Sequence, residues 1–439
     1  MGLLTFKGGV HPFEGKELSA EKPVENLNPG KELVYLLSQH IGAPAKALVK
    51  KGDRVLAGQK IAEAGGFVSA PVHASVSGTV TKLEKRKNAT GAYVDAIIVE
   101  NDEQYESVEF TTADPASLTK EQILERIREA GVVGMGGAGF PTAVKLAPKD
   151  PSKVDYILVN GSECEPYLTS DYRCMIEKPE KIVAGLEIIL GLFGSNCQGV
   201  ICIENNKPKA VRVMEDAIKG KTNMSVKVVK TKYPEGAERC LINAITGRYV
   251  TSKMLPADAG CIVDNVGTVM AVYDAVVNGK PLTKRVFTLT GDAPSDPKNY
   301  LVPVGMSYSE IIEQGGGFKA EPEKIISGGP MMGFALADTE IPVTKTSGAL
   351  TCFLKDEVAA HKTGSCINCG RCMKGCPARL MPNKLADFAK HGDAASFEEY
   401  DGLECVNCGS CSFSCPAKRS LAGEINTMRQ QILAAKKKK

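Results

Sequence analysis

The spacing of apolar and polar residues changes along the chain, and each change predicts a different kind of structure. From about residue 40 to 100, valines and isoleucines alternate with polar residues, and Gly52, Gly58 and Gly78 separate the short runs. A period of two is typical of half-buried strands, and glycines between such runs are typical of turns. This pattern predicts a small β-rich domain at residues 1–110.

The period becomes helical after a polar linker near residues 102–115. In SLTKEQILERIREAG the apolar residues from Ile123 to Ala130 share one face, and Thr119 with Gln122 has the sequence of a capping box. From there to about residue 280, strand-like runs such as VDYILVN and GVICIE alternate with amphipathic runs such as EKIVAGLEIIL and PKAVRVMEDAI. Such alternation predicts an α/β domain with a largely parallel sheet at residues 111–282.

Beyond residue 282 the elements become shorter. RVFTLTGD, an apolar stretch at Val302, a helical run SYSEIIEQGG and KIISGGPMMG fit a small β-grasp domain at residues 283–350, in which the glycines of ISGGPMMG are turn residues. A cysteine-rich domain follows at residues 351–425, and a last helix is expected from about Ala417 to Ala435. The basic tail at residues 426–439 ends in AAKKKK. It predicts a solvated helix end, with contact to an anionic membrane or an acidic partner as the alternative.

Two cysteine runs in the last domain carry the most specific chemical signal. CINCGRCMKGCP and CVNCGSCSFSCP both follow C-x2-C-x2-C-x3-C-P. This is the bacterial ferredoxin spacing, in which three thiolates of one run and the fourth of the other hold one [4Fe–4S] cluster. Gly370 and Gly409 supply backbone freedom for the turns. The expected ligand sets are Cys366, Cys369, Cys372 and Cys415 for one cluster, and Cys405, Cys408, Cys411 and Cys376 for the other.

A structural zinc site and a disulfide framework are the alternatives for these cysteines. Both are disfavoured because the four-cysteine run occurs twice, with a proline at the same place in each copy. The seven cysteines outside the runs follow no pattern and are expected to be reduced thiols of a domain core. The runs therefore predict one-electron transfer, and the rest of the chain should contain the group that exchanges electrons with them.

Charge and hydropathy narrow the class of protein further. Lys+Arg 54 against Asp+Glu 51 gives a net charge of +3, which is too balanced to indicate nucleic-acid binding. The longest apolar region, IVAGLEIILGLFGSNCQGVICI, is interrupted by polar residues and falls short of a bilayer span, and MGLLTF lacks the pattern of a signal peptide. We therefore expect a soluble chain that stays in the cytoplasm.

A glycine-rich loop, VVGMGGAGFPTAVKL, is the best candidate for a nucleotide or flavin site. Gly134, Gly136 and Gly139 have the order G-x-G-x-x-G, but the loop follows a helical run and precedes Phe140 and a proline, so an ordinary dinucleotide fingerprint is disfavoured. Glycines at this density let the backbone lie against a ligand and turn its N–H groups toward a phosphate or a ring edge. Lys145 is placed to meet a phosphate charge. A flexible loop without a ligand is the alternative.

This loop resembles the flavin loop of the NADH-oxidising subunit of complex I. NGSECEP, YPEGAERCLINAITG and CIVDNVGT resemble further segments of that subunit in the same order. The resemblance implies non-covalent FMN and NAD(H), with Glu165 facing the nicotinamide as the catalytic residue and Phe140 shaping the nucleotide pocket. The implied cofactor-binding residues are Gly134, Gly136, Gly137, Gly139, Phe140, Lys145, Asn160, Glu163, Tyr233, Gly236, Glu238, Asn265 and Thr268. Ser162 departs from a family aspartate and Ala237 from a family glutamate.

The segment KGDRVLAGQKI resembles the barrel-sandwich hybrid of biotinyl and lipoyl carrier domains. The hairpin tip of such a carrier presents a modifiable lysine, whereas APVHASVSG has none. We therefore expect a structural barrel without a swinging cofactor, and His73 is expected to be a polar turn residue.

From about residue 4 to 425 the chain is similar to the RnfC family, the peripheral NADH-reactive subunits of Rnf ion-translocating electron transport complexes. This resemblance implies two [4Fe–4S] clusters, FMN, partner subunits that include integral membrane and iron–sulfur subunits, and peripheral attachment at the cytoplasmic face of the inner membrane. Two other functions stay open, a flavin-free electron-relay module and a soluble diaphorase or cobalamin reductase. The N-terminal barrel disfavours the cobalamin reductases, whose chains begin at the glycine loop.

Overall fold

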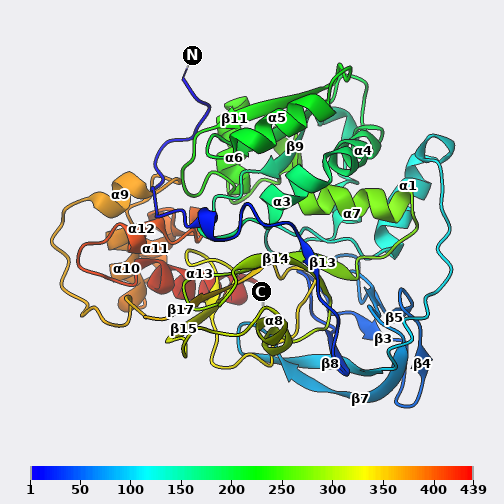
Figure 1. The fold of residues 1–439 in the computed structure, drawn as a ribbon. Helices are drawn as coiled ribbons and strands as arrows, with labels where there is room; N and C mark the ends of the chain where they lie inside the picture. The colour runs from blue at the N-terminus through cyan, green and yellow to red at the C-terminus, as the bar shows by residue number, and fades with distance from the viewer. Residues whose placement is uncertain (1, 438–439) are drawn as a thin grey trace.

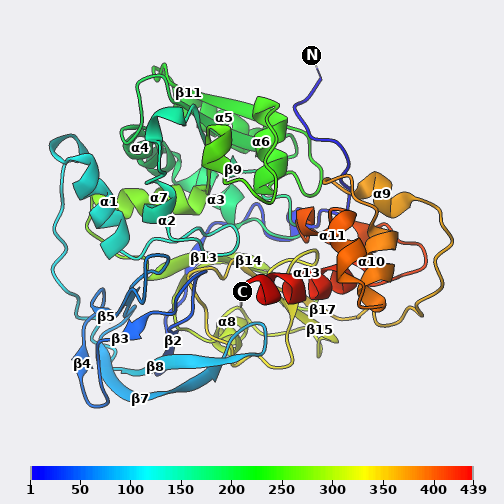
Figure 2. The same ribbon diagram turned by 180° about the vertical axis from the view of Figure 1, so that it is seen from behind.

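The computed structural model describes residues 2–437 and places four packed units side by side. In Figure 1 the α/β domain (green) lies above the β-grasp sheet (yellow), the N-terminal barrel (blue to cyan) lies at the lower right, and the cysteine-rich helices (orange to red) lie at the left. Figure 2 shows the same arrangement from behind. Across residues 2–437 no helix is both long enough and apolar enough to cross a bilayer.

The N-terminal barrel consists of two antiparallel sheets. One sheet has the order β2-β8-β7-β4 and the other has the order β3-β5-β6. Their bounds are β2 Glu32–Leu36, β3 Lys46–Ala47, β4 Arg54–Val55, β5 Lys60–Glu63, β6 Val72–His73, β7 Gly78–Lys87 and β8 Tyr93–Asn101. Inward residues such as Leu33, Tyr35 and Ile97 form one continuous core with Val302 and Tyr308 of the β-grasp domain. The barrel is therefore fixed to the β-grasp sheet and does not move as a carrier arm.

His73 is not the polar turn residue expected from the sequence. It lies in β6 with only 5% of its surface exposed. Burial, followed by the nearby charge of Lys345, holds the pKa of His73 well below its usual range. The residues from 69 to 78 are all buried, so this stretch packs inside the barrel and does not form an exposed hairpin tip like that of a carrier domain.

The α/β domain has a fully parallel sheet of order β11-β10-β9-β12, as the sequence predicted. One face packs on α1, α3, α4, α5 and α7, and the other packs on α6. Both faces of the strands are apolar because helices cover both sides. The bounds are β9 Tyr156–Gly161, β10 Gln198–Glu204, β11 Met224–Val229, β12 Cys261–Asn265, α1 Lys120–Glu129, α2 Thr142–Lys145, α3 Ser170–Glu177, α4 Pro179–Leu190, α5 Pro208–Ala217, α6 Glu238–Thr246 and α7 Val266–Val276. The capping box of Thr119 and Gln122 at α1 is confirmed.

The β-grasp unit is a six-stranded mixed sheet of order β1-β14-β13-β17-β15-β16 beside the helix α8. Strand β1 comes from the N-terminal segment and pairs in parallel with β14. Strand β17 spans residue 350, the predicted end of the domain. The bounds are β1 Glu25–Asn26, β13 Lys284–Thr290, β14 Lys298–Pro303, β15 Lys324–Ser327, β16 Phe334–Ala335, β17 Ala349–Phe353 and α8 Tyr308–Gln314.

A buried lysine joins three of these units beneath the glycine-rich loop. The Lys345 ammonium donates hydrogen bonds to the carbonyls of Pro71 in the barrel (2.6 Å) and Gly131 at the end of α1 (2.7 Å). Burial lowers the pKa of Lys345 to about 7. The next residue, Thr346, packs against Gly139, where a Cβ atom would lie 2.6 Å from the threonine methyl group. The barrel and the β-grasp unit thus support the glycine-rich loop from below.

The cysteine-rich domain packs short helices around Leu385, Phe397, Leu421 and Ile425. The bounds are α9 Arg371–Gly375, α10 Pro382–Lys390, α11 Ala394–Glu399, α12 Ser410–Phe413 and α13 Leu421–Lys437. The last helix begins at Leu421 and not at Ala417 as predicted, because Lys418 has a φ of +54°, which an α-helix does not allow. In the tail, Lys436 pairs with Glu398, while the side chain of Lys437 and residues 438–439 lie outside the described structure.

Candidate iron–sulfur, flavin and nucleotide sites

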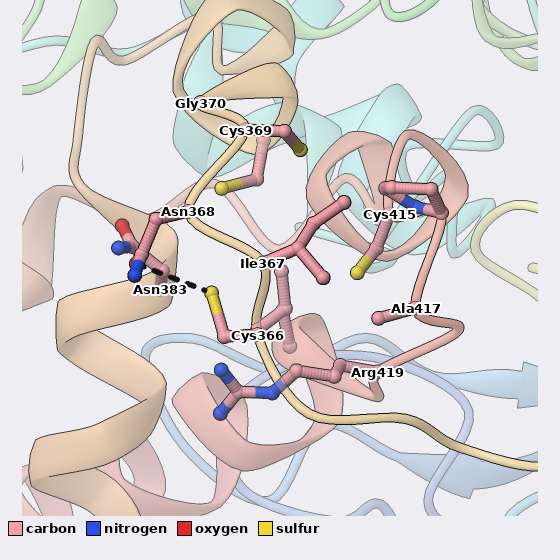
Figure 3. Close-up of a pocket in the computed structure, with 12 residues that line it drawn as sticks. Cys366, Ile367, Asn368, Cys369, Gly370, Asn383, Cys415, Ala417 and Arg419 are labelled. Carbon is pink, nitrogen blue, oxygen red and sulfur yellow. Dashed lines mark hydrogen bonds between the residues drawn. The ribbon is translucent and has the colours of Figure 1, made fainter.

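The first cavity of the cysteine-rich domain brings together the four cysteines of the first predicted set. Cys366, Cys369 and Cys372 line it from one run, and Cys415 lines it from the other. Figure 3 shows the sulfurs of Cys366, Cys369 and Cys415 around this cavity, with Arg419 at its edge. Cys366 and Cys369 are exposed, so this cavity lies at the surface of the domain.

The second cavity brings together the other predicted set in a more buried place. Cys405, Cys408 and Cys411 line it with Cys376, and most of the remaining lining is apolar. Burial raises the pKa of Cys376 to about 11 and that of Cys411 to about 12. Thiolate ligands must be deprotonated, so a bound metal centre has to supply the positive charge that stabilises them here.

The two runs fold alike because the same residue positions adopt left-handed backbone. Gly370 and Gly409 precede α9 and α12 with φ of +71° and +76°. Asn368 and Asn407, one residue before the second cysteine of each run, have φ of +54° and +55°. Asparagine tolerates this conformation better than most residues do. Arg379 and Lys418 lie three residues after the last cysteine of each run, and they also share a left-handed backbone, with φ of +55° and +54°.

The arrangement of donors fits clusters rather than a single ion. Within residues 2–437, no three Cys, His, Asp or Glu side chains converge as the ligands of one metal ion would. Each thiolate of a [4Fe–4S] cluster binds its own iron, so four cysteines around a cavity match that group. The seven other cysteines are free, and all of them except Cys164 are buried.

Arg419 is a buried cation at the edge of the first cavity. Its side chain is 7% exposed and donates to Asp387 at 2.8 Å, and this bond is the main cause that raises the pKa of Arg419. The reduction potential of a cluster depends on nearby charge. We expect Arg419→Met to lower the potential of one cluster only, by on the order of 100 mV, the equivalent of about one charge-assisted hydrogen bond.

An EPR-monitored redox titration of the anaerobically purified protein measures this shift. Arg419→Lys is the matched control, because it keeps the positive charge and should shift the potential less. Equal potentials in Arg419→Met and the wild type would show that this cation does not act on the cluster.

The glycine-rich loop lies between α1 and the short helix α2, next to the carboxyl end of β12. Gly136 faces Asn265, because a Cβ atom on Gly136 would lie 3.0 Å from the Asn265 Cβ atom. The Met135 N–H donates to the buried Thr268 hydroxyl at 2.9 Å. Three consecutive residues of the loop are exposed, namely Gly136, Gly137 and Ala138. Within residues 2–437 their N–H groups donate to no protein acceptor. Free backbone donors in a glycine loop suit an anionic or ring-edge acceptor.

Two asparagines at the carboxyl ends of neighbouring strands lie beside this loop. The Asn160 amide donates to the Gly236 carbonyl at 2.8 Å. Asn265 donates to Asp171 at 2.6 Å and accepts from the Gly267 N–H at 2.9 Å. The carboxyl edge of a parallel sheet is the usual ligand site of α/β domains. Gly134, Gly136, Asn160, Gly236, Asn265 and Thr268 of the predicted set therefore gather at one edge of the sheet.

Lys145 has a protein partner at this edge. Its ammonium donates to the Val263 carbonyl (2.8 Å) and to the buried Asp264 carboxylate (3.1 Å). Burial is the largest single effect on Lys145 and lowers its pKa, but the charges of Asp264 and Glu238 and the hydrogen bond to Asp264 together outweigh it, so the pKa is raised. The second oxygen of Asp264 and the Ser162 hydroxyl are buried without a partner among the described residues. Glu238 is exposed at the start of α6. Unpartnered polar atoms beside free backbone N–H groups fit a polar cofactor such as FMN.

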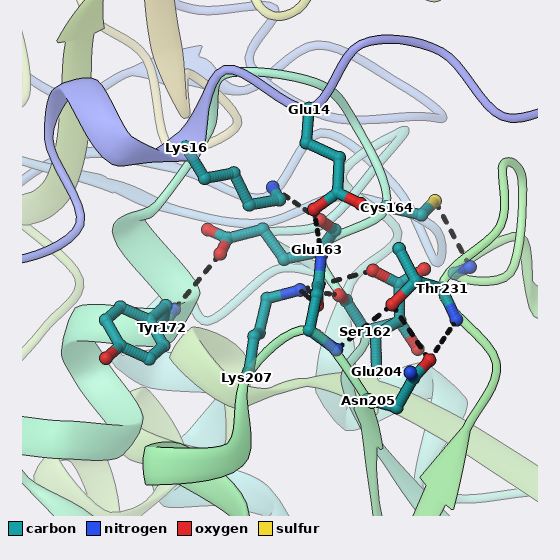
Figure 4. Close-up of polar contacts among 12 residues, drawn as sticks. Glu14, Lys16, Ser162, Glu163, Cys164, Tyr172, Glu204, Asn205, Lys207 and Thr231 are labelled. Carbon is teal, nitrogen blue, oxygen red and sulfur yellow. Dashed lines mark hydrogen bonds and ion pairs between the residues drawn. The ribbon is translucent and has the colours of Figure 1, made fainter.

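Two lysines hold the NGSECEP turn from opposite sides, as Figure 4 shows. Lys16 donates to the carbonyls of Glu163 (2.8 Å), Glu165 (3.1 Å) and Leu168 (2.7 Å). Lys207 donates to the Ser162 carbonyl at 2.6 Å and pairs with the buried carboxylate of Glu204. These contacts fix the backbone of the turn, so its side chains are directed by the fold and not by the loop alone.

Glu163 and Glu165 of this turn face different neighbours. The Glu163 carboxylate accepts from the Asp171 N–H at 2.7 Å, at the start of α3, and burial raises the pKa of Glu163 to about 7. Glu165 accepts from the N–H groups of Met331 (2.8 Å) and Met332 (2.9 Å) in the β-grasp turn, and burial raises its pKa. Gly329 lets Glu165 approach, because a Cβ atom there would lie 2.1 Å from the Glu165 Cγ atom. The glycines of ISGGPMMG were predicted only to be turn residues, whereas Gly329 also makes room for the Glu165 side chain.

Tyr233 connects the α/β domain to the second cysteine run. Its hydroxyl donates to the Cys408 carbonyl at 2.7 Å, and its ring packs with Val10 and Cys408. Val10 pairs with Tyr233 in both directions, and Gly9 donates to the Gly375 carbonyl at 3.0 Å. Phe140 is half-buried at the end of the glycine loop, and its carbonyl accepts from the Gly134 N–H at 2.8 Å. The second cavity is therefore the one that adjoins the α/β domain.

Sequence reasoning missed several residues that shape these sites. They are Lys16, Asp171, Lys207, Met331, Met332 and Arg419. Lys16, Met331 and Met332 contact residues more than a hundred positions away, and Asp171 and Lys207 contact residues 94 and 45 positions away, so no local pattern marks these contacts. Lys16 could have been singled out, because it lies in the opening segment TFKGGVHPFEGKELS, within the range that resembles the RnfC family.

Fold and sites together define a flavin-domain protein with a two-cluster ferredoxin domain. Residues 4–104 match the RnfC barrel sandwich hybrid domain, residues 127–274 the Nuo51 FMN-binding domain, residues 286–335 the SLBB domain and residues 365–420 the 4Fe-4S dicluster domain. The predicted four-part architecture is thereby confirmed. A chain of an NAD+-reducing [NiFe]-hydrogenase in the air-oxidized state shares the fold, with a TM-score of 0.51 and 17% identity, over 74% of this chain and 69% of that chain.

Two curated relatives extend over the whole chain, and both are subunits of ferredoxin:NAD(+) oxidoreductase complexes. The relative from the proton-translocating complex of Clostridium ljungdahlii is 47% identical, over 99% of this chain and 95% of the relative. The relative from the Na(+)-translocating complex of Acetobacterium woodii is 42% identical, over 99% of this chain and 98% of the relative. The chain belongs to the RnfC family of subunits of ion-translocating ferredoxin:NAD(+) oxidoreductase complexes.

Proposed function

We propose that the chain exchanges hydride between NAD(H) and FMN and passes single electrons through two [4Fe–4S] clusters to or from partner subunits. It acts as the peripheral, NAD(H)-reactive subunit of an ion-translocating ferredoxin:NAD+ oxidoreductase complex at the cytoplasmic face of the inner membrane. The relatives' names, the FMN-binding and dicluster domain matches, and the gathering of the cysteines and loop residues support this proposal.

The contact of Tyr233 with the second cysteine run carries the proposal. A residue of the flavin set donates a 2.7 Å hydrogen bond to the carbonyl of Cys408, a residue of the cluster set. Arg239, at the start of α6, pairs with Glu404 at 2.9 Å beside the same run. These bonds hold the two candidate sites together across a domain boundary, as transfer of electrons between them requires.

Residues of the glycine loop and the NGSECEP turn are arranged to bind the flavin and the nucleotide. Free N–H groups of Gly136 and Gly137 and the ammonium of Lys145 suit the phosphate or the ring edge of FMN. Glu165 holds its carboxylate on the Met331 and Met332 N–H groups, which fixes its position and leaves an oxygen to orient a nicotinamide amide. Flavin, when bound, supplies the exchange between hydride transfer and one-electron transfer.

The two cysteine cavities have different places along such a route. The cavity of Cys376, Cys405, Cys408 and Cys411 adjoins the α/β domain through Tyr233. The cavity with Cys366 and Cys369 lies at the surface. We infer that the buried cluster is next to the flavin and that the surface cluster exchanges electrons with the partner.

Anaerobic mixing with NADH tests the proposed function. The flavin absorbance band of the purified protein should bleach on addition of NADH and return on addition of a one-electron acceptor. A protein that contains both clusters but shows no change in any absorbance band with NADH would contradict the proposal.

Glu165→Gln should lower NADH oxidation with an artificial acceptor while flavin and iron contents remain. Glutamine keeps an oxygen for the Met331 and Met332 N–H groups but removes the charge. Loss of one charge-assisted contact made in the transition state corresponds to roughly a ten- to hundredfold lower rate. Steady-state kinetics on the variant measure the effect, and Glu180→Gln in the first turn of α4 is the control. Unaltered kinetics in Glu165→Gln would remove this residue from the nucleotide site.

Attachment to the membrane through partner subunits should be broken by salt. In about 1 M salt the Debye length falls to about 3 Å, which weakens polar contacts between subunits. Washing membranes of the native organism with salt or a mild chaotrope should release the chain, as an immunoblot would show. A chain that leaves the membrane only in detergent would contradict peripheral attachment.

A further inference from the structure

The surface over the first cysteine cavity, which we call the cluster face, is open to solvent at its centre. Cys366 and Cys369 are exposed, and Ile367 between them is 67% exposed while it also lines the cavity. Figure 3 shows Ile367 between the sulfurs of Cys366 and Cys415. The second cavity, in contrast, adjoins the α/β domain, where Tyr233 contacts Cys408. The cluster face is therefore the place where a second protein can come nearest to an iron–sulfur site of this chain.

Exposed cations stand next to residues that line this cavity. Arg371, Lys384 and Lys418 each directly follow a residue that lines the cavity, namely Gly370, Asn383 and Ala417, and all three cations are exposed. Lys362 is also exposed, and it stands near Lys418 because the neighbouring Thr363 hydroxyl donates to the Lys418 carbonyl at 3.4 Å.

None of the four cations, Lys362, Arg371, Lys384 and Lys418, has an ion-pair partner among residues 2–437. Two carboxylates that flank the cysteine runs, Asp387 and Glu424, face the buried Arg419. Residues 358–386 and 405–423 contain no aspartate or glutamate. The whole chain has a net charge of only +3, so the cluster face is a local concentration of positive charge. An apolar centre with an uncompensated charged rim is the anatomy of a docking surface for a partner of opposite charge.

We propose that the cluster face docks an acidic iron–sulfur protein domain that exchanges single electrons with the chain. This proposal rests on the proposed function and names the surface and the charge of its partner. The docked domain places its own cluster over Ile367, with its carboxylates on the four cations. One electron then passes between the two proteins, one being oxidised and the other reduced, and no bond or proton is transferred. A lipid surface would satisfy the cations equally but would exchange no electron with a cluster held by the exposed cysteines.

The test is the rate of electron transfer from a dithionite-reduced, acidic two-cluster ferredoxin to the holoprotein, followed by stopped-flow absorbance. The test variant is the charge reversal Arg371→Glu, Lys384→Glu and Lys418→Glu together. The matched control is Lys51→Glu, Lys149→Glu and Lys227→Glu, three exposed lysines of the barrel and the α/β domain. At about 20 mM salt the rate should fall at least about tenfold in the test variant only, and the wild-type rate should fall with salt while the variant rate does not.

Equal rates in the test variant and the wild type, or equal losses in the test and control variants, would overturn the proposal. Loss of binding to phosphatidylserine vesicles in the test variant, with an unchanged ferredoxin rate, would assign the face to a membrane and also overturn it. Bleaching of the flavin by NADH in the same preparations distinguishes a failure of the docking proposal from a failure of the proposed function. If bleaching is intact while the ferredoxin rate ignores charge, only the docking proposal fails. If bleaching is absent in the wild type, the proposed function fails.

Discussion

Cys369→Ala should lower the iron content from about eight atoms per chain to about four or fewer. Cys369 lines the first cavity with Cys366, Cys372 and Cys415, and alanine removes the thiolate of one corner. Because Cys415 ends the second run and Cys376 ends the first, disorder in one site also reaches a ligand of the other. The loss should therefore extend beyond one cluster in part of the molecules.

Iron and acid-labile sulfide analysis of the anaerobically purified variant measures the effect. Cys197→Ala is the control, because Cys197 is a buried cysteine outside both runs and should leave the iron content unchanged. An unaltered iron content in Cys369→Ala would refute the ligand assignment. Zinc in place of iron in the wild type would favour the structural alternative.

Gly136→Val should reduce the flavin content to about a tenth or less, since loss of more than about 1.4 kcal/mol of binding free energy lowers affinity at least tenfold. A Cβ atom on Gly136 already approaches Asn265 to 3.0 Å, so the branched side chain of valine must displace either Asn265 or the loop. Asn265 holds Asp171 at 2.6 Å, and its displacement would disturb the edge of the sheet where the flavin set gathers.

The flavin released by heat from purified protein, quantified by fluorescence, is the readout for Gly136→Val. Gly194→Val is the matched control, because Gly194 lies in an exposed turn where an added Cβ atom meets nothing within 4 Å. The iron content should remain in both variants, which shows that the chain has folded. Full flavin content in Gly136→Val would place the flavin elsewhere.

The sequence was most informative where geometry is local. The spacing within each cysteine run dictates its turns, and the two cavities bring together the two sets of four cysteines that the spacing predicted. The same holds for the parallel sheet, whose apolar strands alternate with amphipathic helices. That these cysteines ligate iron, and that the loop residues bind FMN, remain predictions from sequence that the geometry fits.

The contacts that the sequence did not reveal are made between residues that lie far apart in the chain. Lys16 reaches the Glu163 carbonyl across 147 positions, and Tyr233 reaches Cys408 across 175. A lysine or a tyrosine in a loop has no periodicity that marks its partner, so only the packed domains determine these contacts. His73 was predicted to be a polar turn residue by likeness to a carrier hairpin, but it lies in a buried strand of the barrel. The predicted start of the last helix was wrong because Lys418, which follows the second cysteine run, has a left-handed backbone.

Cofactor stoichiometry of the anaerobically purified chain shows whether one chain holds both the flavin and the two clusters. We expect about one FMN and about eight iron atoms per chain, with the flavin bleached by NADH. A chain with about eight iron atoms and no flavin would be a relay without a nucleotide reaction and would contradict the account.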